Sequence, residues 1–281
     1  MGWGLTAPLL RETFAPFSFR GRGFPLVLTA VLRYVCGVWD HKALTPPYQR
    51  GRVMFKTFKT PGGHEAQIHC REGTNDAMVA EAVIKEDEYR RYSLIDRTGA
   101  RYIDIGSHIG TWIIAALLDD PDGTGTAVEV IPDNVEMIQK NLAANGLTDR
   151  VQVPARAFAK KGPVTILYGF DAPPGASEEQ QRMAAMHRFI GNQRMPERTG
   201  CIKVAVPAVT PSALFKGKVD AVKIDIEGGE VALVGANLKK VGVISGEYHI
   251  PRGPLYEHMS KTHRVMFDGN ETFGYFTAVP K

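Results

Sequence analysis

From residue 99 to the C-terminus, short apolar runs alternate with helical periods. A continuous apolar-leaning run over 100–105 leads through a glycine turn into a helix over 107–118 that is apolar on nearly all sides. A second strand over 126–130 is followed by a helix whose apolar residues recur at i, i+3 and i+7. This alternation is typical of a parallel sheet with helices on both faces. We therefore predict an α/β fold with a doubly wound, mostly parallel, Rossmann-like sheet.

The same domain, over 99–281, contains further runs that favour strands. Two of them, joined through Gly269 and Asn270, are typical of an antiparallel hairpin at one edge of the sheet. Residues 170–200 break the alternation, and we interpret them as an insertion. The further strands, including these two, are predicted over 150–153, 164–168, 202–206, 219–226, 241–247, 264–268 and 273–279.

Two segments precede this domain. Residues 51–98 contain β-like runs over 52–58 and 65–70, separated by a Pro-Gly-Gly turn and followed by helical sequence, which predicts a hairpin and a helical cap. Residues 1–50 mix aromatic residues with Arg, Gly and Pro, and they predict a basic, aromatic extension with one helix over 26–38.

The formal net charge of +4 is unevenly distributed. Residues 1–60 hold nine Lys or Arg and two acidic residues, a net charge of +7, whereas the rest of the chain carries −3. An excess of this kind indicates an anionic partner for the front segment, such as an anionic membrane surface, or a partner protein. A solvated basic face without any partner is an equal alternative.

Composition and cysteine content exclude several classes of protein. With 44% apolar and 23% charged residues the chain is neither collagen-like, nor of low complexity, nor a polytopic membrane protein. Its longest apolar stretch, 24–39, is interrupted by Arg33 and is shorter than the ~20 residues that cross a bilayer. Three cysteines without a C-x-x-C pair exclude a disulfide framework and a cysteine zinc site. We expect a cytoplasmic protein, or one peripheral to a membrane.

The glycine turn after the first strand of the domain indicates a ligand. Gly106 and Gly110 let the backbone pass close to a bound molecule, and the following helix offers unpaired N–H groups to an anion. Glu129 follows 23 residues after Gly106, at the end of the second strand, where a carboxylate can accept both hydroxyls of a ribose. Together these features predict an adenosine-bearing cofactor.

The residues around the turn distinguish between cofactors. The spacing is G-x-x-x-G, not the G-x-G-x-x-G of dinucleotide-binding proteins, and Asp104 precedes the first glycine. A carboxylate there would repel a pyrophosphate, but it suits an ammonium group such as that of S-adenosylmethionine. The pattern therefore favours the methyl donor over NAD.

Four segments in this order resemble the FkbM-type S-adenosylmethionine-dependent methyltransferases. They are Asp104-Ile-Gly-Ser-His-Ile-Gly, Val128-Glu-Val-Ile-Pro-Asp-Asn, Asn141-Leu-Ala-Ala-Asn-Gly-Leu and Lys223-Ile-Asp-Ile-Glu-Gly-Gly-Glu. The similarity covers about 75–249 and implies a class I methyltransferase fold. The chain departs from the family at His108, where Asn is usual, and at Val128-Glu129-Val130, where Phe-Glu-Pro is usual.

We predict that the turn, the second strand and the segment after the third strand bind the cofactor. His108 is expected to hydrogen-bond the carboxylate of the cofactor or a ribose hydroxyl. The predicted cofactor-binding residues are Asp104, Gly106, Ser107, His108, Gly110, Glu129, Val130 and Ala157.

A second constellation follows two later strands and provides the candidate catalytic residues: Asp225, Glu227, Glu247 and His249. If the two strands are adjacent, these groups line one crevice at their carboxyl ends. His249 is the first choice of general base, since its unperturbed pKa of about 6.5 is close to working pH, and Asp225 and Glu247 follow closely. As alternatives, the four groups hold a divalent cation, or Glu227 and Glu230 cap the following helix.

These expectations amount to an S-adenosylmethionine-dependent O-methyltransferase. The resemblance implies as acceptor a hydroxyl on a sugar, a glycan end or another small hydroxylated metabolite. Thr45-Pro46-Pro47-Tyr48 keeps open an N-methyltransferase acting on an amine or a nucleic-acid base, although no strand precedes this segment and no nucleic-acid partner is expected. A non-catalytic Rossmann-like binding module is the other alternative.

Overall fold

The computed structural model describes residues 52–89, 98–169, 189–191 and 201–281, and these belong to one compact unit that spans 47–281. The predictions for residues 1–51, including the helix over 26–38, lie outside this description. So does most of the insertion at 170–200. No helix among the described residues is both long and apolar enough to cross a membrane.

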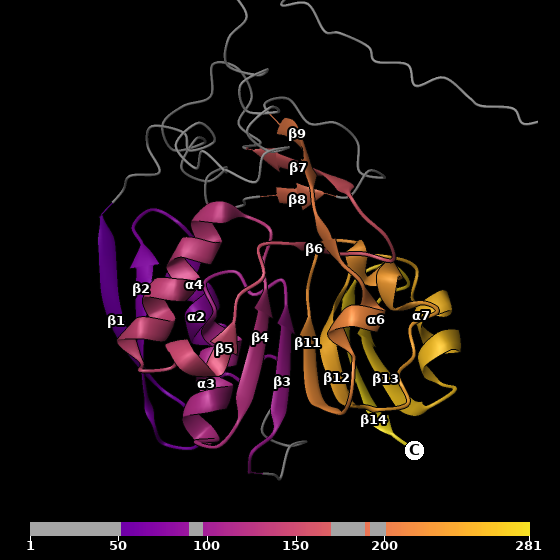
Figure 1. Ribbon diagram of the computed structural model, residues 1–281, viewed down its shortest axis with the longest axis horizontal. Helices are drawn as coiled ribbons and strands as arrows, with labels where there is room; N and C mark the ends of the chain where they lie inside the picture. The colour runs from indigo at the N-terminus through magenta and orange to yellow at the C-terminus, as the bar shows by residue number, and fades with distance from the viewer. Residues whose placement is uncertain (1–51, 90–97, 170–188, 192–200) are drawn as a thin grey trace, which may run out of the picture. The chain divides into compact units, whose positions relative to one another are not determined.

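A seven-stranded sheet forms the centre of the unit (Figure 1), in the order β13-β14-β12-β11-β3-β4-β5. Strands β5, β4, β3, β11 and β12 are parallel, and β14 runs antiparallel between β12 and β13. This confirms the α/β fold, the mostly parallel sheet and the hairpin at one edge. The strands are β3 (Arg101–Ile105), β4 (Thr124–Val128), β5 (Val151–Gln152), β11 (Val219–Ile224), β12 (Val241–Tyr248), β13 (His263–Gly269) and β14 (Gly274–Pro280).

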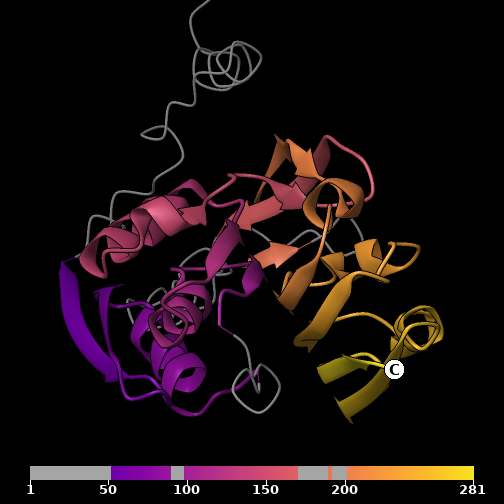
Figure 2. The same cartoon turned by 60° about the horizontal axis from the view of Figure 1, so that its bottom comes forward.

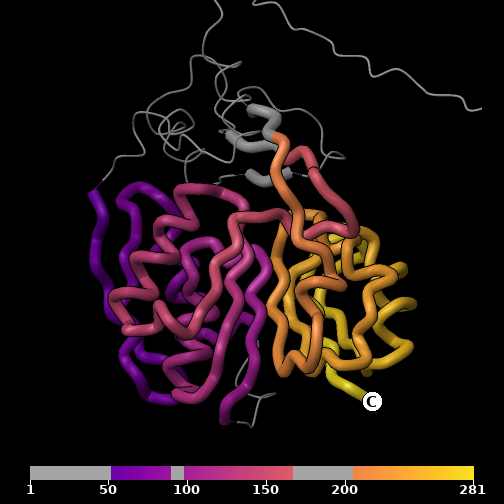
Figure 3. Tube along the Cα trace, in the orientation of Figure 1, coloured from indigo at the N-terminus to yellow at the C-terminus, as the bar shows by residue number. Residues whose placement is uncertain are grey.

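The two faces of the sheet are buried by different elements. In β3, Tyr102 points to one face and Ile103 and Ile105 to the other, because successive side chains of a strand alternate. Tyr102 packs in the core that holds α2 (Asp76–Lys85), α3 (Thr111–Asp119) and α4 (Pro132–Ala144). The two isoleucines pack in the core of α6 (Pro211–Leu214), the short 3-10 helix η4 (Gly229–Leu233) and α7 (Arg252–Met259). Figure 3 shows the two halves of the chain side by side, meeting where β3 pairs with β11.

Two predicted strands do not belong to the central sheet. The predictions over 164–168 and 202–206 correspond to β7 (Val164–Gly169) and β9 (Cys201–Val206), which pair with β8 (Phe189–Gly191) in a separate antiparallel sheet. The prediction that these two strands belong to the parallel sheet was wrong. They pair antiparallel within a separate sheet, and antiparallel strands can be joined without the helix that a parallel connection needs. Two short strands, β6 (Ala157–Phe158) and β10 (Ala208–Val209), pair parallel beside this sheet.

The predicted hairpin is confirmed as β1 (Val53–Lys59) and β2 (Glu65–Arg71). Figures 1 and 2 show it on the outer side of the helices, away from the central sheet. Buried side chains of the hairpin, such as Ile68 and Cys70, join the core that also holds Trp112 of α3. The cap and the domain predicted over 99–281 therefore share one hydrophobic core.

Asn141 of α4 and Asn145, which caps its C-terminus, join the hairpin to the helix. The Asn141 Oδ1 atom accepts the His69 N–H at 2.7 Å, and its amide nitrogen donates to the His69 carbonyl at 3.3 Å. Asn145 makes the same pair of hydrogen bonds with the backbone of Gln67, at 2.9 and 2.7 Å. The edge of β2 that does not face β1 is thus paired with side-chain amides.

Candidate functional site

The glycine turn lies between β3 and α3 and packs against the end of β11. Gly106, His108 and Gly110 all have positive φ angles, of 78°, 51° and 85°, so the helix begins at Thr111 and not at residue 107. A Cβ atom on Gly106 would lie 1.8 Å from the carbonyl oxygen of Asp225. The first glycine is therefore required by the close approach of two strand ends, whereas Gly110 forms the N-cap of α3.

Asp104 is completely buried near the end of β3, and neither carboxylate oxygen has a hydrogen-bond donor among the described residues. Its nearest cation is the Lys223 ammonium from β11, at 3.4 Å, which also donates a hydrogen bond of 2.6 Å to the Gly106 carbonyl. Burial raises the pKa of Asp104, and Lys223 opposes this only in part. Burial lowers the pKa of Lys223, but the carboxylates of Asp104 and Asp225 outweigh it and raise that pKa. A ligand with hydrogen-bond donors could therefore satisfy the Asp104 carboxylate.

Glu129 directly follows β4 and is held by the backbone of the same turn. Its Oε2 atom accepts the His108 N–H at 2.8 Å, and its Oε1 atom accepts the N–H groups of Val130 and Ile131 at 2.6 and 2.8 Å. These bonds fix the carboxylate, which is only 4% exposed. The Oε2 atom, which accepts one hydrogen bond, retains a further lone pair for a hydroxyl donor, whereas Oε1 already accepts two.

The His108 side chain points to the cap. Its Nε2 atom lies 3.1 Å from a carboxylate oxygen of buried Asp76, and its buried Nδ1 atom has no hydrogen-bond partner in the described part of the chain. Arg71 donates two hydrogen bonds to Asp76 and one to Asn134 of α4. Burial would raise the pKa of Asp76, but the hydrogen bonds from His108 and Arg71 hold it well below its usual range. The cap thereby fixes one side of the turn.

A cavity of about 720 Å³ opens at the carboxyl ends of β3, β4 and β11, where the strand order reverses and doubly wound sheets bind ligands. Gly110, Glu247 and His249 are absent from its lining, and the predicted role of Gly110 in cofactor binding is not supported by its position. The predicted residues that do line the cavity are Asp104, Gly106, Ser107, His108, Glu129, Val130, Ala157, Asp225 and Glu227.

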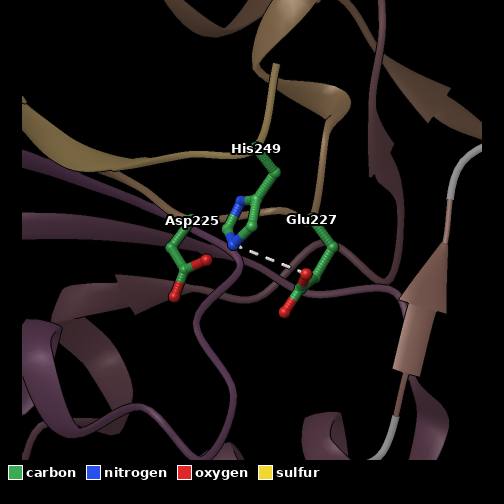
Figure 4. A group of neighbouring side chains, drawn as sticks. All are labelled: Asp225, Glu227 and His249. Atoms are coloured by element: carbon green, nitrogen blue, oxygen red, sulfur yellow. Dashed lines mark ion pairs between the residues drawn. The ribbon is translucent and has the colours of Figure 1, made fainter. Parts of the chain in front are cut away.

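The predicted catalytic residues come together as expected. β11 and β12 are neighbours, with Ile224 paired to Gly246, so the residues that follow them meet at one edge. Figure 4 shows Asp225, Glu227 and His249 pointing toward one another. The His249 Nε2 atom lies 3.5 Å from Glu227 and 3.6 Å from Glu247.

Glu230, a residue of η4, connects this cluster to the turn that precedes η4. It is fully buried, and its carboxylate accepts the N–H groups of Ile226 and Gly228, both at 3.2 Å. The same Oε1 atom lies 3.4 Å from the His249 Nδ1 atom. Glu230 therefore holds the turn, as the capping alternative predicts, and it also orients the imidazole.

The carboxylates change the acid-base properties of the cluster. Burial lowers the pKa of His249, but the hydrogen bond to Glu230 and the charge of Glu227 outweigh it and raise the pKa to about 9. With this pKa the His249 imidazole is protonated at neutral pH, so His249 is not the first choice of general base that an ordinary imidazole pKa suggests. Burial, assisted by the charge of Asp225, raises the pKa of Glu247 to about 7. Glu247 is the group whose pKa best matches a general base at neutral pH.

The cluster also has the donor atoms of a cation site. One donor atom from each of Asp225, Glu227 and His249 lies within 4.8 Å of the others. Two carboxylates and an imidazole suit a hard or borderline divalent ion. Binding an ion would require the imidazole to lose its proton first.

Two residues of the site were not predicted from the sequence. Lys223 is a buried cation in a mostly apolar strand, and that position is the signal that could have identified it as the partner of a buried acid. Tyr89 donates a hydrogen bond of 3.0 Å to the Asp225 Oδ2 atom, and its ring lies 5.1 Å from the Lys223 ammonium. No local pattern marks Tyr89, because its partners are more than 130 positions away.

Comparisons with known proteins show similarity in fold. No protein family profile and no curated protein matches the sequence. Among solved structures, TYW2 from M. jannaschii in complex with AdoMet aligns with a TM-score of 0.41 and 11% identity, over 82% of this chain and 86% of that one.

Two precorrin-6Y C5,15-methyltransferases align over 68% of this chain and 85% of each of theirs. The protein from Geobacter metallireducens GS-15 has a TM-score of 0.40 and 16% identity. The C-terminal domain of the protein from Rhodobacter capsulatus has a TM-score of 0.37 and 14% identity. Similarities of this size do not identify an activity.

Proposed function

We propose that this protein is an S-adenosylmethionine-dependent methyltransferase that acts on a hydroxyl of a sugar, a glycan end or another small hydroxylated metabolite. The observation that carries the proposal is the Asp104 carboxylate, buried beside the cavity with two oxygens that lack a donor. An ammonium group satisfies such oxygens, whereas a pyrophosphate would be repelled. Glu129 is fixed by three backbone N–H groups, and the free lone pair of its Oε2 atom supports a hydrogen bond from a ribose hydroxyl.

The sheet order supports a methyl donor over a dinucleotide. Strands β5, β4, β3, β11 and β12 follow the doubly wound order 3-2-1-4-5, but the next position is taken by the antiparallel strand β14. Dinucleotide-binding sheets of this order continue with a sixth parallel strand. The inserted antiparallel strand agrees with the class I methyltransferase fold that the FkbM-type resemblance implies.

The acidic cluster supplies the chemistry on the acceptor side. S-adenosylmethionine supplies a methyl group on a sulfonium, whose carbon–sulfur bond breaks as the acceptor oxygen forms its bond to carbon. A base must take the hydroxyl proton during or after this displacement. We assign that role to Glu247, which does not line the cavity but lies 3.6 Å from the His249 imidazole, itself 3.5 Å from Glu227 of the lining. Asp225 and Glu227 orient the hydroxyl. His249, as an imidazolium, holds these carboxylates in place.

A divalent cation is a second way to activate the hydroxyl, favoured by the 4.8 Å spacing of the donor atoms of Asp225, Glu227 and His249. A bound cation would lower the pKa of a coordinated hydroxyl. Activity that is lost with a chelator and restored by Mg²⁺ or Mn²⁺ would support this route. Activity that is indifferent to a chelator would leave Glu247 as the base.

The cofactor proposal is tested by calorimetry with S-adenosylmethionine, S-adenosylhomocysteine and NAD on one preparation. We expect both sulfur compounds to bind and NAD not to bind. Asp104→Asn and Glu129→Gln should each weaken binding at least about tenfold, because hydrogen bonds to charged groups contribute roughly 1.5 to 3 kcal/mol. Asp122→Asn is the matched control, because it changes an exposed aspartate in the loop between α3 and β4, outside the cavity lining. Binding of NAD alone would refute the proposal.

The acceptor is sought with labelled S-adenosylmethionine in fractionated cell extract. Label in lipid-linked material would support a further part of the proposal, that residues 1–60 with their charge of +7 contact an anionic membrane surface or a partner protein. Label in water-soluble metabolites would instead favour a cytoplasmic acceptor.

A further inference from the structure

Three cations line one end of the cavity. Arg156 directly precedes β6, Lys160 and Lys161 lie between β6 and β7, and all three belong to the lining of the cavity. They are exposed, and none of them forms an ion pair within the described parts of the chain. This end of the cavity therefore carries uncompensated positive charge, although residues 61–281 have a net charge of −3.

Among the described residues, none of the acids of the cavity lining forms an ion pair with these cations. The segment Gly228–Ala232 contributes Gly228, Gly229, Val231 and Ala232 to the cavity, and none of these side chains is charged. The carboxylates elsewhere in the cavity have other partners. Asp76 is paired with Arg71, Asp104 lies 3.4 Å from Lys223, and Glu227 lies 3.5 Å from His249. Glu129 accepts three backbone N–H groups, and Asp225 accepts a hydrogen bond from Tyr89. The three exposed cations are therefore available to an anionic ligand.

The proposed cofactor does not supply an anionic group at this end. S-adenosylmethionine has one anionic group, a carboxylate attached to the carbon that bears its ammonium. If the ammonium lies at Asp104, the carboxylate lies at that end too, next to the turn and the cap. The adenosine moiety is uncharged, so the three cations are left for a second ligand.

The cavity has room for that ligand. Its volume of about 720 Å³ lies in the upper part of the ~300–1,000 Å³ that pockets for a single small molecule span. The same cavity reaches Asp225 and Glu227, where the acceptor hydroxyl is expected. One molecule can therefore present a hydroxyl to the acidic cluster and an anionic group to the cations.

We propose that the acceptor is a phosphorylated hydroxylated compound, such as a sugar phosphate, whose phosphate is bound by Arg156, Lys160 and Lys161. This inference rests on the proposed function and narrows its substrate class. A phosphate carries a charge of roughly −1.5 to −2 at neutral pH and three acceptor oxygens, which match three cations better than a single carboxylate does.

The test measures anion binding to protein that is already saturated with S-adenosylhomocysteine. Inorganic pyrophosphate is titrated by calorimetry at constant ionic strength, and malonate serves as a carboxylate of similar charge and size. We expect saturable pyrophosphate binding to the wild type and much weaker binding of malonate. Lys160→Ala/Lys161→Ala should weaken pyrophosphate binding at least about tenfold. Lys216→Ala/Lys239→Ala, two exposed lysines outside the cavity lining, should leave it unchanged.

Each other outcome would overturn the inference in a distinct way. Equal weakening in both double variants would mean non-specific attraction, and equal affinity for malonate would mean that the site takes carboxylates. Pyrophosphate that binds only when S-adenosylhomocysteine is absent would assign the cations to the cofactor site. The cofactor titration separates the two proposals, since cofactor binding without any pyrophosphate binding refutes only the substrate class.

Discussion

Replacing Gly106 with Ala should cost much more stability than the same replacement usually does at a glycine in the left-handed conformation. The φ angle of 78° alone costs about 1 kcal/mol for a residue with a Cβ atom. In addition, this Cβ would lie 1.8 Å from the Asp225 carbonyl oxygen, where real Cβ contacts essentially never come closer than 3.0 Å. The ends of β3 and β11 must therefore separate, which weakens the 3.0 Å hydrogen bond from the Asp225 N–H to the Ile105 carbonyl.

Together these effects predict a loss of about 3 to 5 kcal/mol in the free energy of unfolding. Gly146→Ala is the matched control, because Gly146 has a φ angle of 68° but no heavy atom within 4 Å of the place that a Cβ atom would take. We expect it to lose only about 1 kcal/mol. Urea denaturation followed by circular dichroism gives both values. Equal losses in the two variants would refute the argument that Gly106 is required by the approach of the strand ends.

Three further variants test the buried charges. Lys223→Met should cost about 3 to 5 kcal/mol, since it leaves a buried carboxylate without its cation, and adding Asp104→Asn should recover most of this in urea denaturation; no recovery would contradict the pairing. The positive charge of His249 contributes its full stabilisation below pH 6.5, the pKa of His249 in the unfolded chain. This stabilisation is lost as the pH rises through about 9, the pKa of His249 in the folded protein. His249→Gln should therefore reduce the fall in stability between pH 6.5 and 9 by up to roughly 3 kcal/mol, and an unchanged slope would count against an imidazolium. Tyr89→Phe removes a donor from a partly buried carboxylate and should cost about 1 to 3 kcal/mol. Tyr275→Phe should cost less, because Tyr275, which donates to Glu88, is less buried than Tyr89; the reverse order in thermal denaturation would contradict this.

The parts of the fold that the sequence predicted are those whose signals are local. The run over 100–105, the glycine turn and the helix after it are adjacent in the chain, so one strand–turn–helix unit can be recognised without its neighbours. The same holds for the hairpin over 52–70. β7 and β9 were recognised as strands, but their sheet was not, because pairing depends on partners that periodicity does not identify.

The site shows the same division. Asp104 and Glu129 were predicted because each ends a recognisable strand. Lys223 and Tyr89 were missed because their importance comes from contacts with residues far away in the chain. The pKa of His249 could not be anticipated either, since three carboxylates from two different segments surround the imidazole.

The spacing of the Asn141 and Asn145 amides along the helix matches the spacing of alternate residues along β2. Four residues of a helix rise about 6 Å, and two residues of a strand rise about 6.8 Å, so side chains one helical turn apart reach alternate residues of β2. The helix thereby substitutes for a third strand of the hairpin and covers an edge that would otherwise be open to pairing with another chain. A chain shortened to begin at residue 99 would lose this pairing and expose the apolar side of α3. We expect such a fragment to aggregate rather than to fold as a smaller domain.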